Sequence, residues 1–145
     1  MLGRICAGMM AWNDNLVITP GYAVDRARAN APKPPADAGP KHPDTFKPEE
    51  LAWRLELEPH IEWARVYAMA LAGNTAFYAG SVFNGWAKGR YDGSFLWMKS
   101  TTDGKTRQKE IKLDARPSYD AMAVAGGRVY LALQSGELVC WGKVE

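Results

Sequence analysis

The sequence contains few of the residues from which metal and redox sites are built. It has two cysteines, Cys6 and Cys140, and two histidines, His42 and His60. The cysteines form no CxxC pair and the histidines have no HxxH or HxH spacing, so we expect neither a zinc site nor a thioredoxin-like motif. We interpret the cysteines as two small buried apolar residues. The alternative is a disulfide joining the two ends of the chain in an oxidising compartment.

A strong excess of charge and a long apolar run are also absent. The formal net charge is +2, from 18 basic and 16 acidic residues, and the longest basic cluster, residues 25–28, contains an acid. We therefore expect no nucleic-acid partner. No segment offers the roughly 20 apolar residues of a membrane span. The apolar stretch of residues 1–10 is interrupted by glycine and does not resemble a signal peptide.

Several motifs that suggest catalysis are incomplete. The Ser-Tyr-Asp run at 118–120 has no GxSxG context, so we expect Asp120 to hydrogen-bond the start of an inner strand instead. The glutamates between 56 and 62 follow an alternating pattern, which favours a solvated strand face over a glycosidase pair. The glycines of 85–93 lack the GxxxxGK[ST] pattern of a phosphate loop. We expect no enzyme, no catalytic residue, no cofactor and no metal.

The strongest positive signal is an internal repeat. Residues 68–79 (AMALAGNTAFYA) and 121–132 (AMAVAGGRVYLA) are identical at six of twelve positions. Each copy reads as an apolar strand, a Gly-Asn or Gly-Gly turn with positive φ, and a second apolar strand, which predicts a tight β-hairpin. A fainter third copy, matched in pattern rather than identity, occupies residues 8–18.

The strand pattern predicts sheets that are covered on both faces. Tyr67, Met69 and Leu71 alternate with alanines, so neither face of that strand is polar. Further strands are expected after each hairpin, and four strands per unit is the blade of a β-propeller. The predicted fold is therefore all-β: a partial β-propeller of about three blades built from four-stranded antiparallel sheets.

The predicted organisation has five segments along the chain. They are the inner hairpin of a first blade (1–19), a Pro-rich insertion loop (20–50), the outer strand of that blade with a linker (51–65), a complete blade with an aromatic loop at 82–93 (66–115), and a C-terminal blade (116–145).

The last of these segments resembles a known family. Residues 116–132, followed by 135–142, look like the final blade of PQQ-like (quinoprotein-type) β-propeller repeat proteins. The turn at 103–105 resembles the family's turn between outer strands, and Trp53 resembles the tryptophan that docks one blade onto the next. The equivalent place in the middle blade, near Gln108, departs from the pattern.

The resemblance implies a binding scaffold, with a periplasmic or cell-envelope location in bacteria. It does not imply the quinone cofactor, because quinoprotein dehydrogenases hold the quinone beside a disulfide of adjacent cysteines, and Cys6 and Cys140 are not adjacent. We expect a non-catalytic propeller segment serving interaction or structure, as a C-terminal fragment of a larger protein. The alternative is the C-terminal part of a PQQ-dependent oxidoreductase with its catalytic residues upstream. A third possibility is a β-sandwich carbohydrate-binding module.

The expected partners follow from the number of blades. About three blades cannot close a ring, since propellers have about four to eight. The chain should therefore join the remainder of a larger propeller or a second copy of itself.

One loop has the composition of a binding site. Aromatic side chains beside Asn and Arg suit a protein or carbohydrate ligand, because they combine stacking with directional hydrogen bonds. The alternative is that the aromatic residues pack against the rim of the propeller. The predicted ligand-binding residues are Phe83, Asn84, Trp86, Arg90 and Tyr91.

Overall fold

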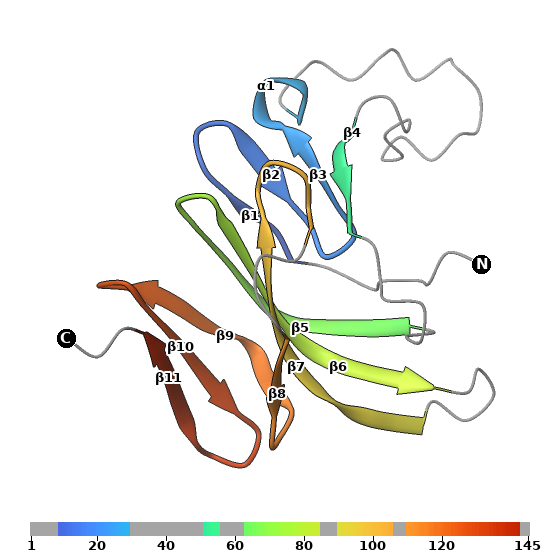
Figure 1. The fold of residues 1–145 in the computed structure, drawn as a ribbon, viewed down its shortest axis with the longest axis vertical. Coiled ribbons are helices and arrows are strands. Elements are labelled where there is room, and N and C mark those ends of the chain that lie inside the picture. Colours follow the sequence, from blue (N-terminus) through green and yellow to red (C-terminus); the bar gives the residue numbers. More distant parts are fainter. Residues whose placement is uncertain (1–8, 30–50, 56–62, 85–89, 106–109, 143–145) are drawn as a thin grey trace.

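The computed structural model describes residues 9–29, 51–55, 63–84, 90–105 and 110–142. These residues form an all-β fold of three antiparallel sheets, which we name A, B and C in chain order (Figure 1). Within the described parts of the chain, no helix is long and apolar enough to cross a membrane.

Each sheet is a meander in which consecutive strands pair. Sheet A contains β1 (Ala11–Trp12), β2 (Leu16–Ile18), β3 (Tyr22–Asp25) and β4 (Leu51–Arg54), with the short helix α1 (Arg26–Ala29) after β3. Sheet B contains β5 (Trp63–Ala72), β6 (Thr75–Asn84), β7 (Arg90–Ser100) and β8 (Ile111–Leu113). Sheet C contains β9 (Pro117–Ala125), β10 (Arg128–Leu133) and β11 (Leu138–Gly142).

The prediction of antiparallel sheets is confirmed, with four strands in the middle sheet and three in the last. Two boundaries differ from the prediction. The segment 20–50, expected to be a loop throughout, contains β3 and α1. The sequence Tyr22-Ala23-Val24 forms a strand because it is a short apolar run whose second and third side chains are buried. The expected loop at 82–93 is largely strand, because β6 continues to Asn84 and β7 begins at Arg90.

The repeated hairpins have the turns that the sequence predicts. Gly73 has a φ of 53°, and Gly126 and Gly127 have φ values of 56° and 72°. Ala72 pairs with Thr75 in one copy and Ala125 pairs with Arg128 in the other, so each turn has two residues. A side chain at these positions would be strained, which explains why glycine ends each first strand of the repeat.

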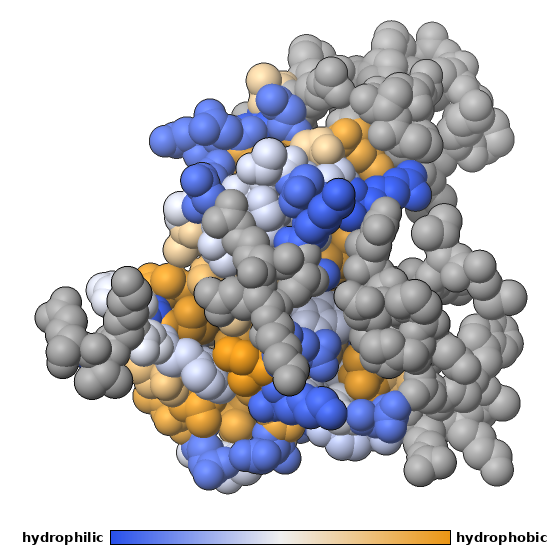
Figure 2. Space-filling view, viewed as in Figure 1, coloured by the Kyte–Doolittle hydropathy of each residue, from blue (hydrophilic) through white to orange (hydrophobic). Residues whose placement is uncertain are grey.

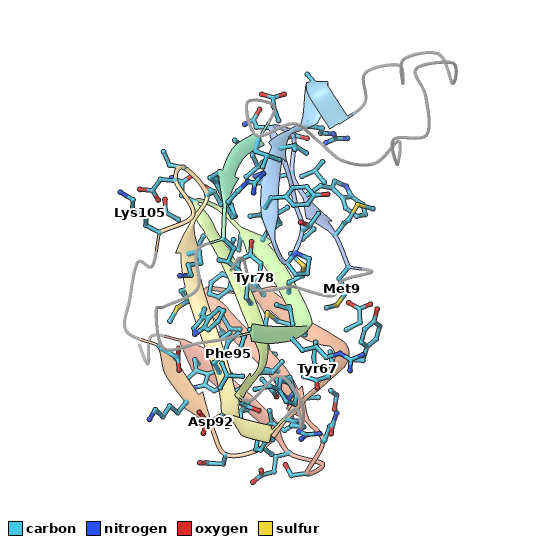
Figure 3. All side chains as sticks on the ribbon, turned by 90° about the vertical axis from the view of Figure 1, so that its right-hand side faces the viewer. Met9, Tyr67, Tyr78, Asp92, Phe95 and Lys105 are labelled. Atoms are coloured by element: carbon cyan, nitrogen blue, oxygen red, sulfur yellow. The ribbon has the colours of Figure 1, made fainter. Side chains whose placement is uncertain are left out.

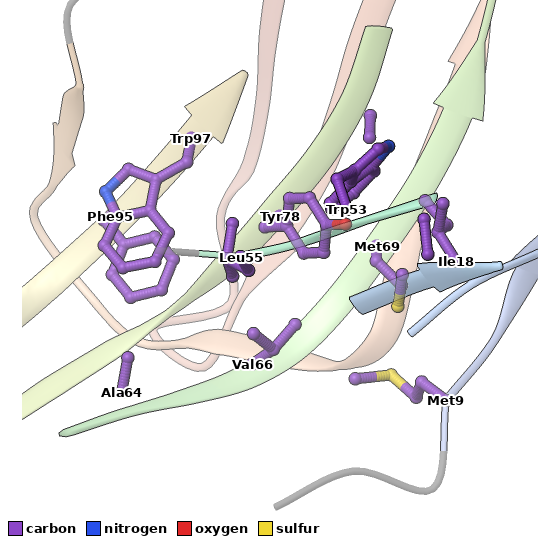
Figure 4. Packing of buried hydrophobic residues seen from close by; sticks show 12 residues of the cluster. Met9, Ile18, Trp53, Leu55, Ala64, Val66, Met69, Tyr78, Phe95 and Trp97 are labelled. Atoms are coloured by element: carbon purple, nitrogen blue, oxygen red, sulfur yellow. The ribbon is translucent and has the colours of Figure 1, made fainter. Parts of the chain in front are cut away.

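Sheet B lies in the middle and is buried on both faces. On one face, Met69, Ala76 and Tyr78 belong to a core shared with sheet A (Figure 4). On the other face, Ala68 and Ala79 belong to a core shared with sheet C. The sequence predicted that both faces of β5 are covered, and this is confirmed. The large side chains Met69 and Leu71 face sheet A, and the alanines face sheet C.

Tyr67 departs from this alternation. The pairing of β5 with β6 shifts between Val66 and Ala68, which leaves Tyr67 without a register partner as in a β-bulge. Because of this extra residue, Val66 and Met69 share the face toward sheet A although they are three positions apart. Tyr67 belongs to neither core and lies instead beside the Arg65 guanidinium, 5.7 Å from the ring centroid.

Sheets A and B are joined by a specific contact of Trp53. The indole Nε1 of Trp53, on β4, donates a hydrogen bond of 2.9 Å to the carbonyl oxygen of Thr101 in the turn after β7. Gly104 in the same turn lies under the indole ring, with a φ of 70°. Trp53 therefore docks onto the following sheet, at the position that the sequence suggested.

Replacing Gly104 tests this contact. A Cβ at Gly104 would lie 2.6 Å from the nearest ring atom of Trp53, whereas a Cβ at Gly127 would meet nothing within 4 Å. Both glycines have a similar positive φ, so both alanine variants share the backbone strain. We expect Gly104→Ala to lower the free energy of unfolding by about 1–3 kcal/mol more than Gly127→Ala, measured by urea denaturation. Equal losses would contradict the docking role of Trp53.

Tyr78 is the largest fully buried side chain and lies in the interior of the molecule (Figure 3). It pairs across β6 and β7 with Trp97, which stacks on Phe95 with 3.5 Å between ring centroids. Its hydroxyl lies 3.5 Å from the carbonyl oxygen of Thr19, to which it donates, so it reaches across to the sheet A side. Burial raises the pKa of the Tyr78 phenol well above its ordinary value of about 10.

The raised pKa predicts an alkaline loss of stability. Above about pH 10 the unfolded chain loses the Tyr78 proton while the folded chain keeps it, so the free energy of unfolding falls as pH rises, by up to about 1.4 kcal/mol per pH unit. We expect Tyr78→Phe to show a shallower fall between pH 9.5 and about 11 in urea denaturation. Tyr119→Phe, at an exposed tyrosine, should follow the wild type. Parallel curves for wild type and Tyr78→Phe would contradict this.

Candidate binding site at the β6–β7 hairpin

The candidate site lies where β6 ends and β7 begins. Phe83 pairs with Tyr91 and Asn84 pairs with Arg90 in the antiparallel register, so four of the five predicted residues are neighbours along this hairpin. Trp86 lies outside the described residues, as do the side chains of Asn84 and Arg90. The pairing shifts between Ser81 and Phe83, and such irregularities turn the side chains at strand ends.

Phe83 and Tyr91 have different roles. Phe83 is only 8% exposed, so it contributes to packing and not to the surface. The expectation that Phe83 is exposed is therefore wrong. Tyr91 is 38% exposed and remains accessible. The two rings meet edge to face, with centroids 6.2 Å apart and planes at 70°, which is a favourable geometry for aromatic pairs.

Arg116 completes this aromatic pair and was not singled out from the sequence. It precedes β9, far from the hairpin in sequence, yet its guanidinium carbon lies 4.4 Å from the Tyr91 ring centroid. The same carbon lies 5.8 Å from the Phe83 centroid. Arg116 thus stacks on both rings by cation–π contact and links sheet B to the segment that begins sheet C. No pattern in the sequence relates Arg116 to Tyr91, because only the fold brings them together.

The hydroxyl group of Tyr91 is held by a chain of hydrogen bonds through two serine hydroxyls. The Tyr91 hydroxyl is 3.0 Å from Ser94 Oγ, and Ser94 Oγ is 2.9 Å from Ser81 Oγ. Both serines are buried, so their hydroxyls need these partners to offset the loss of water. The sequence analysis did not single out these two serines, which are register partners and face each other directly across β6 and β7.

The arrangement is suited to binding. The ring of Tyr91 is partly accessible, its hydroxyl is bonded to Ser94, and the Arg116 guanidinium lies over the ring. The guanidinium also carries several hydrogen-bond donors. An oriented aromatic surface next to such donors can stack on a planar or ring-shaped ligand and hydrogen-bond its polar groups. Within the described residues, no group of three or more His, Cys, Asp or Glu side chains could hold a metal ion.

The other interpretation was that Trp86 and Tyr91 pack against the protein and do not bind a ligand. Phe83 is packed, and Tyr91 is both packed by Arg116 and exposed. Trp86, which belonged to the same interpretation, lies outside the described residues.

Two further expectations from the sequence need correction. Asp120 is exposed, has a φ of 52°, and forms no hydrogen bond with the start of the strand within the described residues. It occupies a left-handed conformation that Asp tolerates better than most residues. Cys140 is a free, exposed thiol on β11, not a buried apolar residue, because its position faces away from the core. Cys6 lies outside the described residues.

Comparison with known proteins identifies no relative. No family model matches the chain, and neither the curated proteins nor the solved structures contain a significant match. The class that the structure defines is an all-β protein of three antiparallel sheets.

Ser94 is the residue through which the hydroxyl chain can be tested. Ser94→Ala would leave the buried Ser81 hydroxyl and the Tyr91 hydroxyl without this partner. We expect the free energy of unfolding to fall by about 1–3 kcal/mol, measured by urea denaturation. Ser135→Ala removes an exposed serine that bonds Glu137, and should change stability by less than about 0.5 kcal/mol. A similar small change in both variants would show that the hydroxyl chain does not hold Tyr91.

Proposed function

We propose that this chain is a non-catalytic segment of a β-propeller that serves as an interaction scaffold. In this proposal the three sheets are blades, and the hairpin of β6 and β7 contacts a protein or carbohydrate ligand. The single observation that carries the binding role is the accessible Tyr91, fixed on one side by Arg116 and at its hydroxyl by Ser94.

Three features of the sheets support the propeller part of the proposal. Each sheet is an antiparallel meander, as propeller blades are. The first strands of the sheets are neighbours in space, β1 beside β5 and β5 beside β9, as inner strands around a common axis would be (Figure 1). Sheets follow one another face to face, and Trp53 docks sheet A onto the outer turn of sheet B.

Pre-organisation of Tyr91 supports the binding part. A side chain that is already held in one orientation loses little conformational entropy when a ligand stacks on it. The contacts that hold Tyr91 come from one buried serine and from an arginine of another segment, so the ring orientation depends on the packing of the whole sheet. Tyrosine and arginine are also the residue types enriched among those that dominate binding energy in interfaces.

The binding role is tested by alanine substitution at the hairpin. The probes are a glycan array and a random peptide library displayed on phage. Once a ligand is selected, Tyr91→Ala, Trp86→Ala and Arg90→Ala should each weaken binding about tenfold or more, with the thermal midpoint of Trp86→Ala and Arg90→Ala unchanged. Tyr119→Ala is the matched control, because Tyr119 is 67% exposed and belongs to β9 and not to the hairpin.

Three outcomes would count against the proposal. Binding unaffected by all three hairpin variants would remove the hairpin as the contact surface. An equal loss in Tyr119→Ala would show that the probe recognises aromatic surface in general. Absorbance changes and stabilisation on adding the quinone with calcium would favour the oxidoreductase alternative, whereas the scaffold proposal expects neither.

A further inference from the structure

The outward surface of sheet C is mostly apolar, with the exposed Arg128 at its hairpin end and the exposed Cys140 beside Tyr130, and nothing within the described residues covers it. Ala123 pairs with Tyr130, and Ala132 pairs with Leu138, so these four side chains share one face. Leu138 is 70% exposed, and Ala123 is also exposed. Figure 2 shows hydrophobic side chains gathered over the region of β9, β10 and β11. We call this the C face, formed by Ala121, Ala123, Ala125, Tyr130, Ala132 and Leu138.

The internal repeat identifies what kind of surface covers such a face. When the two copies of the repeat are aligned, five residues of the C face correspond to residues of sheet B, and sheet C covers those sheet B residues. Four of these five positions are alanine in both copies and the fifth is aromatic in both. The pairs are Ala68 with Ala121, Ala70 with Ala123, Ala72 with Ala125, Phe77 with Tyr130, and Ala79 with Ala132.

The residues of sheet C that cover the corresponding face of sheet B are also known. Sheet C covers the alanine face of sheet B with Val129 and Leu131, and with the partly buried Met122 and Val124. Sheet B covers sheet A in the same way, with the equivalent residues Ala76, Tyr78, Met69 and Leu71. The partner of a C face should therefore be a sheet that presents a methionine and a large apolar residue, each at a fixed distance before a hairpin turn.

Sheet A carries such a surface, and it is exposed. Asn13 and Leu16 close the first hairpin through a backbone hydrogen bond, so Asp14 and Asn15 form its turn. Counted back from that turn, Met10 takes the position of Met69 and Met122, and Trp12 takes the position of Leu71 and Val124. Met10 is 63% and Trp12 62% exposed. We call Met10, Trp12 and Val17, the register partner of Trp12, the A face.

We propose that the C face of one copy packs on the A face of a second copy of this chain. The contact repeats the one that joins sheets A, B and C within the chain, so it needs no new kind of interface. It is heterologous, because it joins two different surfaces, and such contacts generate rings where the rotation closes. Two copies supply six sheets, within the range of about four to eight blades in propellers. The ring closure rests on the proposed function, whereas the pairing of the two faces does not.

The experiment measures mass in solution by sedimentation equilibrium. The wild type should be a dimer. Ala123→Glu on the C face and Trp12→Glu on the A face should each raise the dimer dissociation constant roughly a hundredfold or more, because an unpaired carboxylate is strongly disfavoured in an apolar interface. Ala132→Glu, at a C-face position paired with the apolar Leu138, should repeat the C-face result. Ala27→Glu, an exposed alanine on α1 outside both faces, is the matched control and should remain dimeric.

Mixing the two blocked variants identifies the pairing. In a closed head-to-tail dimer, Ala123→Glu disrupts both interfaces, and so does Trp12→Glu. An equimolar mixture of the two has one interface in which both faces are native, so a heterodimer should reappear with at least about tenfold tighter association than either variant alone. A face that pairs with itself would behave differently: Trp12→Glu would then leave a C-face dimer intact, and mixing would restore nothing.

Two results would overturn the proposal. One is a wild type that stays monomeric at all accessible concentrations while its near-ultraviolet circular dichroism shows fixed aromatic packing. That result would assign the C face to a different partner, such as a further sheet, and would leave the ligand-binding proposal for the hairpin standing. The other is a dimer that persists in Trp12→Glu. Ligand binding that none of the hairpin variants weakens, together with an intact dimer, would contradict only the proposed function.

Discussion

The middle sheet must be apolar on both faces, and most of the structure follows from this requirement. A sheet with one polar face can end a stack, but sheet B has a neighbour on each side. Its side chains are therefore divided by size and not by polarity, with Met69, Ala76 and Tyr78 toward sheet A and alanines toward sheet C. The few buried polar groups on sheet B, such as Ser81 and Ser94, are tolerated because they bond each other.

Apolar contact alone does not fix how one sheet sits on the next, because it has little directionality. Two directional contacts supply what apolar packing lacks. The Trp53 indole bonds one carbonyl oxygen and fits over a glycine that leaves room for it, which fixes sheet A against the turn of sheet B. Arg116 stacks on Tyr91 and fixes the segment leading into sheet C against the hairpin of sheet B. The candidate site is thus built on an element that also joins two sheets.

The sequence predicted what depends on local patterns and on the repeat. The hairpins at Gly73 and Gly126 and the two-sided sheet leave signals in spacing and residue type. The docking of Trp53 was expected only from the family resemblance. The strand at Tyr22–Asp25 left no such signal, because it is short and lies in a segment whose average composition is that of a loop. The contact of Arg116 with Tyr91 joins residues that no pattern relates. Phe83 was expected at the surface because residue type alone does not reveal which member of the Phe83–Tyr91 pair is buried.

A chain that stacks sheets through one repeated pair of faces presents both faces again at the ends of the stack. The division by size within sheet B recurs in sheets A and C, so one end carries alanines around Tyr130 and the other carries Met10 and Trp12. Apart from Arg128 at the hairpin end of sheet C, the residues that we assign to the two faces are uncharged, whereas charged residues commonly protect exposed sheets from association. The same repeat that holds the three sheets together therefore makes the ends complementary to each other, and a second copy can satisfy both without any residue changing its role.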